Sequence, residues 1–168
     1  ITGGAAQPSS VETVALRAAT WTTDADNSFY NVYSGNKIVQ GNVNFSALLV
    51  GSASADQRFY DNIIEGNWIV GGALATAFDI TTWYGERVTI RNNLIDGAAA
   101  TLTSGNYLPI AIRNQAATPN PTTDVNVYNN TIYTGSVSSP ALHGILINTT
   151  VTDSLVKNNL CWLDLGAA

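Results

Sequence analysis

With 168 residues, the chain is long enough for one domain with a continuous apolar core. Its net charge of −5 and its isoelectric point near 4.5 provide no basic patch for phosphates, so we expect no nucleic acid partner. No stretch approaches 18 consecutive apolar residues, so we expect no insertion into a membrane.

The first 30 residues precede the repeats described below. Ser9 is followed three residues later by Glu12, and then by Val14 and Leu16, which is the pattern of a capping box that opens a short amphipathic helix. A strand of an additional coil is the alternative. We therefore predict an N-terminal cap segment over residues 1–30 and the repeats over residues 31–168.

One pattern recurs five times after residue 30. It reads NVYSGNKIVQG from Asn31, NIIEGNWIVGG from Asn62, VTIRNNLIDG from Val88, VNVYNNTIYTG from Val125 and SLVKNNLCWLD from Ser154. Each copy contains a reference asparagine, and these are Asn36, Asn67, Asn93, Asn130 and Asn159, separated by 31, 26, 37 and 29 residues. A period of this length is typical of stacked repeat folds.

The residues around each reference asparagine fall into columns. Three residues before it stand Tyr33, Ile64, Ile90, Val127 and Val156, and two residues after it stand Ile38, Ile69, Ile95, Ile132 and Cys161. Both columns are apolar and predict core positions, where Cys161 would act as a small hydrophobe. Two residues before it stand Ser34, Glu65, Arg91, Tyr128 and Lys157, which predicts a solvent-facing column with Glu65 beside Arg91.

A second strand is predicted in each interval between these copies. Its apolar pairs are Leu48/Val50, Phe78/Ile80, Ile110/Ile112 and Ile145/Ile147, which keep the period of two of a half-buried strand. A unit that cannot bury its own apolar face must stack on its neighbours, so the pattern predicts a parallel solenoid. The five asparagines would mark one corner, where their amides form a ladder.

These repeats of the form V-x-I-x-N-N-x-I resemble the right-handed parallel β-helix of the pectin-lyase-like superfamily, over about Asn31 to Trp162. The resemblance implies an all-β, right-handed parallel β-helix of about five coils. It implies little about activity, because this fold carries polysaccharide lyases and hydrolases as well as tailspikes and adhesins.

Two classes of function remain open. The first is a non-enzymatic structural or binding module of a virion, tail-spike or secreted surface protein, with an expected extracellular or virion-surface location. It is favoured by the low charged fraction of 11%. The C-terminal coil ends in CWLDLGAA with no terminal element, so we expect another protein chain or domain, a further copy included, to stack on it. A polysaccharide is the other expected partner.

The second class is a polysaccharide lyase or glycoside hydrolase, or a fragment of one. The resemblance implies an Arg or Lys base, with calcium as a cofactor in the lyase case only. Asp79 and Arg113 are expected to project outward from adjacent coils, with His143 entering the following coil. The alternative for Asp79 and Arg113 is a surface ion pair between rungs, and for His143 a turn residue. No metal site is predicted.

Aromatic residues outside the core columns are candidate ligand contacts. They are Trp68, Trp83, Tyr84, Tyr133 and Trp162. Flat aromatic side chains bind sugar rings and also anchor protein partners. The alternative is that they pack beneath the long loops at residues 98–107 and 114–124.

Overall fold

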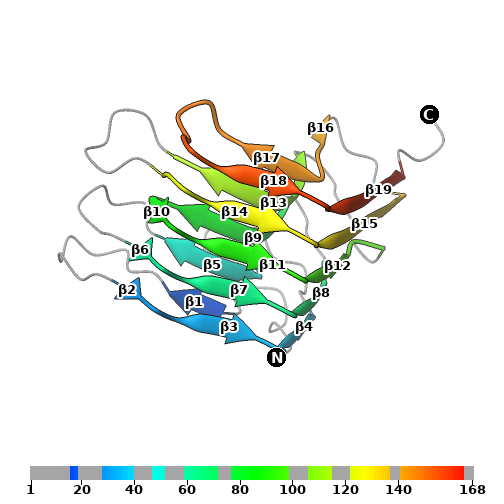
Figure 1. The fold of residues 1–168 in the computed structure, drawn as a ribbon. Coiled ribbons are helices and arrows are strands. Elements are labelled where there is room, and N and C mark those ends of the chain that lie inside the picture. Colours follow the sequence, from blue (N-terminus) through cyan, green and yellow to red (C-terminus); the bar gives the residue numbers. More distant parts are fainter. Residues whose placement is uncertain are drawn as a thin grey trace, which may run out of the picture.

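A computed structural model describes residues 16–18, 28–39, 47–51, 59–71, 77–98, 106–114, 122–136 and 141–164. All regular structure in this part of the chain is β-strand, and all the strand pairs are parallel. The strands lie in rows stacked one above another from the N-terminal to the C-terminal end (Figure 1). This is the parallel solenoid that the sequence pattern predicts.

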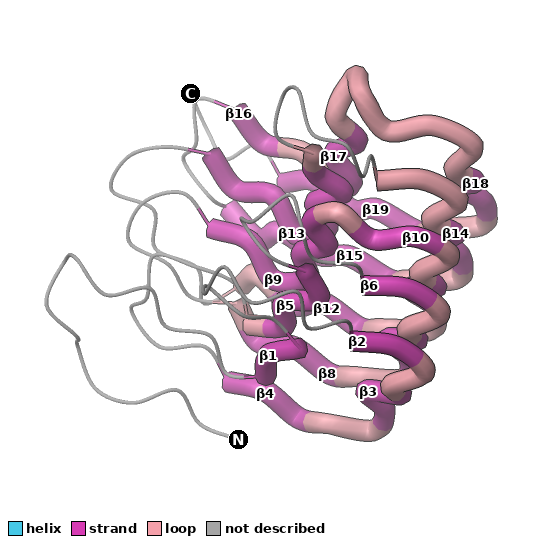
Figure 2. The backbone as a smooth tube through the Cα atoms, turned by 90° about the vertical axis from the view of Figure 1, so that its left-hand side faces the viewer, coloured by secondary structure: helices cyan, strands magenta, loops and turns pink. Residues whose placement is uncertain are grey.

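Four sheets run along the stack. The front sheet contains β3 (Val32–Ser34), β7 (Ile63–Glu65), β11 (Thr89–Arg91), β14 (Asn126–Tyr128) and β18 (Leu155–Lys157). The side sheet contains β4 (Lys37–Val39), β8 (Trp68–Val70), β12 (Leu94–Asp96), β15 (Thr131–Ser136) and β19 (Leu160–Asp164). The back sheet contains β1 (Leu16–Ala18), β5 (Leu48–Gly51), β9 (Ala77–Trp83), β13 (Asn106–Arg113), β16 (Ala141–Leu142) and β17 (Ile145–Ile147). A short sheet contains β2 (Ser28–Phe29), β6 (Phe59–Tyr60) and β10 (Gly85–Glu86), which run side by side in Figure 2.

The first strand of the chain bears on the predicted N-terminal helix. Leu16–Ala18 form a strand that pairs with Leu48–Val50 of the back sheet. The alternative of an additional strand therefore holds for these three residues. Ser9, Glu12 and Val14 lie outside the described residues.

The two predicted apolar columns are confirmed. Strand pairing aligns the column from Tyr33 to Val156 in the front sheet and the column from Ile38 to Cys161 in the side sheet. Their central members are fully buried and belong to one hydrophobic cluster. The solvent-facing column is confirmed too, with Glu65 and Arg91 in an ion pair at 2.7 Å.

The predicted pairing of the back sheet needs one correction. Leu48 pairs with Ile80 and Val50 pairs with Thr82, so the second member of this column in β9 is Thr82. Phe78, which the sequence pattern assigned to the repeat, pairs with Leu108 instead. The strand β9 is longer than the four-residue β5, and alternation alone does not show which pair of its residues meets the neighbouring rung.

The predicted asparagine ladder is confirmed. The Nδ2 of each reference asparagine donates to Oδ1 of the next one toward the C-terminus, and all four of these bonds measure 2.9 Å. The backbone N–H of the same donor residue reaches the same Oδ1 at 3.0 to 3.1 Å. A second Nδ2 hydrogen bond goes to a backbone carbonyl, for example from Asn93 to Ile64 at 3.0 Å. Asn67, Asn93 and Asn130 are buried, so the ladder satisfies polar groups that water cannot reach.

The doubled amide in the sequence is explained by the backbone. The residue before each reference asparagine has a positive φ of 54 to 65°, and these residues are Gly35, Gly66, Asn92, Asn129 and Asn158. Glycine and asparagine tolerate this left-handed conformation best. The first amide of the pair therefore turns the chain, and the second one bonds to the neighbouring rungs.

Candidate functional site

Asp79 does not project to solvent, so the predicted outward position of this residue is wrong. Its side chain is fully buried, and its Oδ2 accepts a hydrogen bond from the Tyr107 hydroxyl at 2.6 Å. Burial raises the pKa of Asp79 to about 7, although the Tyr107 hydrogen bond opposes this shift. The Tyr107 hydroxyl lies against Gly71 and Gly97, where a Cβ atom would approach it to 2.7 Å.

Arg113 lies apart from Asp79. It is half-buried at the end of β13, and its strand partner is Trp83. The centre of its guanidinium group stands 5.2 Å from the Trp83 ring centroid, which is a cation–π geometry. The structure therefore does not bring Arg113 and Asp79 together, and it places a tyrosine that the sequence analysis missed beside Asp79.

His143 is exposed between β16 and β17. Its backbone N–H donates to the Tyr107 carbonyl at 3.2 Å, so its main chain continues the stack. His143 therefore lies in the connection between two strands, which agrees with the alternative interpretation of a turn residue. A catalytic role for His143 stays a prediction.

Two of the aromatic candidates are buried. Trp83 is 7% exposed and Tyr84 is 3% exposed, so their interpretation as contacts at the surface is wrong. Trp83 is the last residue of β9, where it pairs with both Gly51 and Arg113. The Arg113 guanidinium group stands over its ring.

The other three aromatic candidates share one face. Trp68, Tyr133 and Trp162 all lie on the solvent side of the side sheet, opposite its buried isoleucine column. Trp162 is 69% exposed, and its ring meets the half-buried Tyr133 edge-on with centroids 5.7 Å apart. The Lys37 ammonium stands 3.9 Å from the Trp68 ring centroid. The solenoid therefore gathers aromatic rings from three separate repeats.

The sequence analysis missed the aliphatic part of this face. The residues one and three positions after each reference asparagine are Lys37 and Val39, Trp68 and Val70, Leu94 and Asp96, Thr131 and Tyr133, and Leu160 and Trp162. We call this set the side-sheet face. Leu94 and Leu160 within it are exposed. The same column alignment that located the core would have located this face, because alternate strand residues point to opposite sides.

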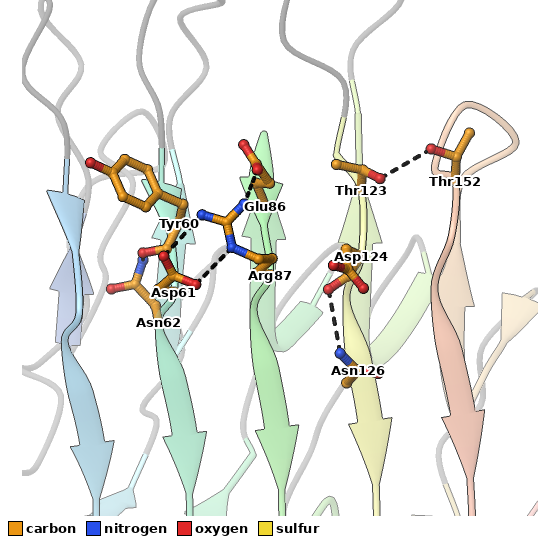
Figure 3. A network of polar contacts seen from close by, with 9 residues as sticks. All are labelled: Tyr60, Asp61, Asn62, Glu86, Arg87, Thr123, Asp124, Asn126 and Thr152. Atoms are coloured by element: carbon orange, nitrogen blue, oxygen red, sulfur yellow. Dashed lines mark hydrogen bonds and ion pairs between the residues drawn. The ribbon is translucent and has the colours of Figure 1, made fainter.

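A polar network occupies the corner between the short sheet and the front sheet (Figure 3). Arg87 donates from Nε to Asp61 Oδ1 at 2.8 Å and from a terminal nitrogen to Asp61 Oδ2 at 2.9 Å, and it also contacts Glu86. This pairing lowers the pKa of Asp61. The corner is shared with Thr123, which accepts a hydrogen bond from the Thr152 hydroxyl at 3.2 Å. These exposed contacts tie neighbouring rungs together.

The network also has a conformational cost. The left-handed residue of this corner is in turn Tyr30, Asp61, Arg87, Asp124 and Asp153, with φ between 52 and 57°. Arg87 lacks the short polar side chain that makes this conformation easy for Asp or Asn. Its bidentate bond to Asp61 therefore accounts for an arginine at a turn position, and this bond links two neighbouring rungs.

The described residues contain no cluster of three or more His, Cys, Asp or Glu side chains suited to a metal ion. In the same part of the chain there is no helix with the length and apolar character needed to cross a membrane. Comparison of the chain with family models, with curated proteins and with solved structures gives no match. The side-sheet face and the buried pair of Asp79 and Tyr107 are the features of the described residues that bear on function.

Proposed function

We propose that the chain is a non-enzymatic structural and binding module, a right-handed β-helix of about five coils and of the pectin-lyase-like type, that contacts a polysaccharide through the side-sheet face. The observation that carries this proposal is the exposure of large apolar side chains there. Trp162 is 69% exposed, Leu160 64%, and Trp68 and Leu94 42% each. Contiguous exposed apolar surface of this kind marks an interaction site in soluble proteins.

Strand register makes these side chains neighbours. Trp68 is the strand partner of Leu94, and Leu94 and Leu160 both flank Thr131 from adjacent rungs. Neighbouring strands lie about 4.8 Å apart, so one extended ligand can touch several rungs at once. The rigid stack holds the rings in place and lowers the entropy cost of binding.

The polar members of the face favour a sugar polymer over a protein as its ligand. Lys37 is the strand partner of Trp68, Asp96 lies between Val70 and Tyr133, and Thr131 lies between Leu94 and Leu160. A dry protein interface would have to remove water from the Asp96 carboxylate, which costs free energy unless this charge is paired. Sugar hydroxyls can bond to these groups while the C–H faces of the sugar rings cover the apolar side chains.

The expected location follows from composition. Only 11% of the residues are charged, and the chain contains 14 glycines. We propose that the module belongs to an extracellular or virion surface, where polysaccharides are met. An enzymatic function is not proposed, because Arg113 and Asp79, which would carry it, do not face each other.

The test is affinity electrophoresis of the purified chain in gels that contain neutral or uronate-containing polysaccharides. We expect at least one polysaccharide to retard the wild-type chain and Leu160→Glu to abolish this retardation, because a charge would then stand beside Trp162 on the same side of β19. Leu155→Glu is the matched control, since Leu155 is an exposed leucine of the front sheet. A gel without polysaccharide measures the mobility change that the added charge causes. After correction for this change, polysaccharide should retard Leu155→Glu as much as it retards the wild type.

Cleavage is followed on the same panel by absorbance of unsaturated ends and by reducing sugar. The proposal expects retardation without cleavage. Retardation that survives Leu160→Glu, or cleavage that Arg113→Ala abolishes, would contradict it.

A further inference from the structure

The two charged residues of the side-sheet face lie in different strands. Lys37 belongs to β4, and its ammonium group stands 3.9 Å from the Trp68 ring centroid. Asp96 belongs to β12, which lies between β8 and β15 in the side sheet (Figure 1). The acidic residue therefore stands in the middle strand of the described sheet, and the basic one stands at one end of it.

Asp96 is flanked by apolar and aromatic side chains of the same face. Its strand partners are Val70 on one side and Tyr133 on the other. Leu94 stands two residues before Asp96 in the same strand and therefore points to the same side of the sheet. An extended ligand that covers both Leu94 and Tyr133 therefore passes over the Asp96 carboxylate.

The face is longer along the stack than along a strand. Each strand of the side-sheet face contributes two residues to it, whereas strand register continues the same two positions from rung to rung. A polymer that contacts several rungs therefore runs across the strands. Trp68 and Tyr133 lie on opposite sides of β12, so a polymer that contacts both of them crosses β12 beside Asp96.

The contacts of Asp96 leave it a negatively charged acceptor. The residue is half-buried, and its Oδ1 accepts a hydrogen bond from the Ala98 N–H at 3.0 Å. None of the ion pairs among the described residues includes Asp96. A carboxylate accepts hydrogen bonds from hydroxyl groups and repels other anions. Asp96 therefore favours the hydroxyl groups of a sugar over its carboxylates.

The remaining charges do not reverse this preference. Two strand spacings, or about 10 Å, separate β4 from β12, and salt at 0.1 M screens exposed charges over about the same distance. Lys37 therefore compensates little for an anion placed over Asp96. The net charge of −5 of the whole chain also disfavours an anionic polymer.

We propose that Asp96 makes the side-sheet face selective for neutral polysaccharides, whose hydroxyl groups donate to its carboxylate, and that its charge rejects polymers of uronic acids. This inference rests on the proposed function, because it names the chemical class of the ligand at the same face. Asp96 is then the residue that determines specificity, while the rings and leucines supply apolar contact.

The test compares two forms of one polymer by titration calorimetry. The first is the neutral polysaccharide that retards the wild-type chain most, and the second is the same polymer after oxidation of its primary alcohol groups to carboxylates. EDTA is present throughout, because a divalent cation can bridge two carboxylates. We expect the oxidised form to bind the wild type with a Kd at least tenfold weaker. This difference should shrink in 1 M salt, where the screening length falls to about 3 Å.

Two variants assign the difference to one residue. Asp96→Asn removes the charge and keeps a side-chain carbonyl oxygen that can accept from the Ala98 N–H, so we expect it to bind both forms with similar Kd values. Asp124→Asn is the matched control, since it changes the net charge equally at an exposed corner position outside the face (Figure 3). Asparagine also suits its φ of 57°. The control should keep the full difference between the two forms.

The outcomes separate this inference from the proposed function. A difference that persists in Asp96→Asn, or that disappears equally in Asp124→Asn, would overturn the role of Asp96. Uronate polymers that retard the wild type as strongly as neutral ones would overturn the inference and leave the binding module in place. Retardation by no polymer at all would contradict the proposed function, and the inference with it.

Discussion

At the scale of single residues, the buried pair of Asp79 and Tyr107 is the most unusual feature of the described chain. Oδ2 of Asp79 accepts one hydrogen bond, and its Oδ1 has no partner. Burial raises the pKa of Tyr107 well above its ordinary value, and the nearby charges of Asp79 and Asp96 add to this effect. A carboxyl group in such surroundings favours its neutral form, so the pair makes stability depend on pH.

The expected pH dependence follows from the pKa of about 7 for Asp79 in the folded chain, against 3.8 ordinarily. Between these two values the folded chain keeps a proton that the unfolded chain has lost, so stability falls as pH rises from about 4 to about 7. The loss is of the order of 4 kcal/mol. Asp79→Asn should remove it, since its side chain has no charge to bury.

This prediction is checked by urea unfolding of both proteins at pH 4, 6 and 8. The variant should match the wild type at pH 4 and exceed it in unfolding free energy at pH 8. Parallel pH profiles for the two proteins would show that Asp79 is not the titrating group.

At the scale of the elements, we expect the ladder asparagines to contribute more to the free energy of unfolding than the turn residues beside them. The side chain of Asn93 takes part in four hydrogen bonds of the corner, with Asn67, Asn130 and the Ile64 carbonyl. Asn92, directly before it, is exposed and serves only to turn the chain at a φ of 55°. Two adjacent asparagines therefore make a matched pair for mutation.

We expect Asn93→Ala to lower the unfolding free energy by about 3 kcal/mol or more, because it leaves two buried donors of Asn67 without an acceptor. Asn92→Gly should change it by less than about 0.5 kcal/mol, since glycine adopts the left-handed conformation freely. Chemical denaturation with intact β-sheet circular dichroism measures both. Equal losses at the two positions would contradict the division of roles within the pair.

Gly51 tests the packing of the back sheet. It has a φ of 137°, and a Cβ atom there would collide with the backbone of Trp83. Gly51→Ala should therefore cost more than about 3 kcal/mol, because backbone atoms cannot move aside as a side chain can. Gly35→Asn is the control: it also has a positive φ, but open space surrounds its Cβ position. Thermal denaturation measures both variants, and we expect the control to lose less than about 1 kcal/mol of unfolding free energy. Equal losses for the two variants would contradict the close packing at Gly51.

At the scale of the whole molecule, the features set by the repeat could be predicted from the sequence, and those set by the surroundings of one residue could not. The inward columns and the Asn36 to Asn159 ladder repeat in the sequence, so their alignment follows from stacking. The burial of Asp79 in β9 depends on Tyr107 of β13 and on room left by Gly71 and Gly97, which follow β8 and β12. No local pattern contains that information.

The exposure of individual members of a column also could not be predicted from the sequence alignment of the repeats. Cys161 and Ile132 hold equivalent positions, yet Ile132 is fully buried and Cys161 is exposed, so the expected burial of Cys161 is wrong. For the candidate site, the aromatic members Trp68 and Trp162 could be named from the sequence, whereas Trp83 was misassigned because alternation alone does not show that the end of β9 is buried. Exposure is thus a property of the assembled stack.

The central claim is that the side-sheet face binds a polysaccharide, and the dissociation constant of Trp162→Ala tests it most directly. Trp162 is the most exposed large apolar residue of this face. Tyr30 is about equally exposed but lies at another corner of the coil, and Tyr30→Asn suits its positive φ. Titration calorimetry with the polysaccharide that retards the chain most should give a Kd at least tenfold weaker for Trp162→Ala and unchanged for Tyr30→Asn. Equal Kd values for wild type and Trp162→Ala would contradict the account.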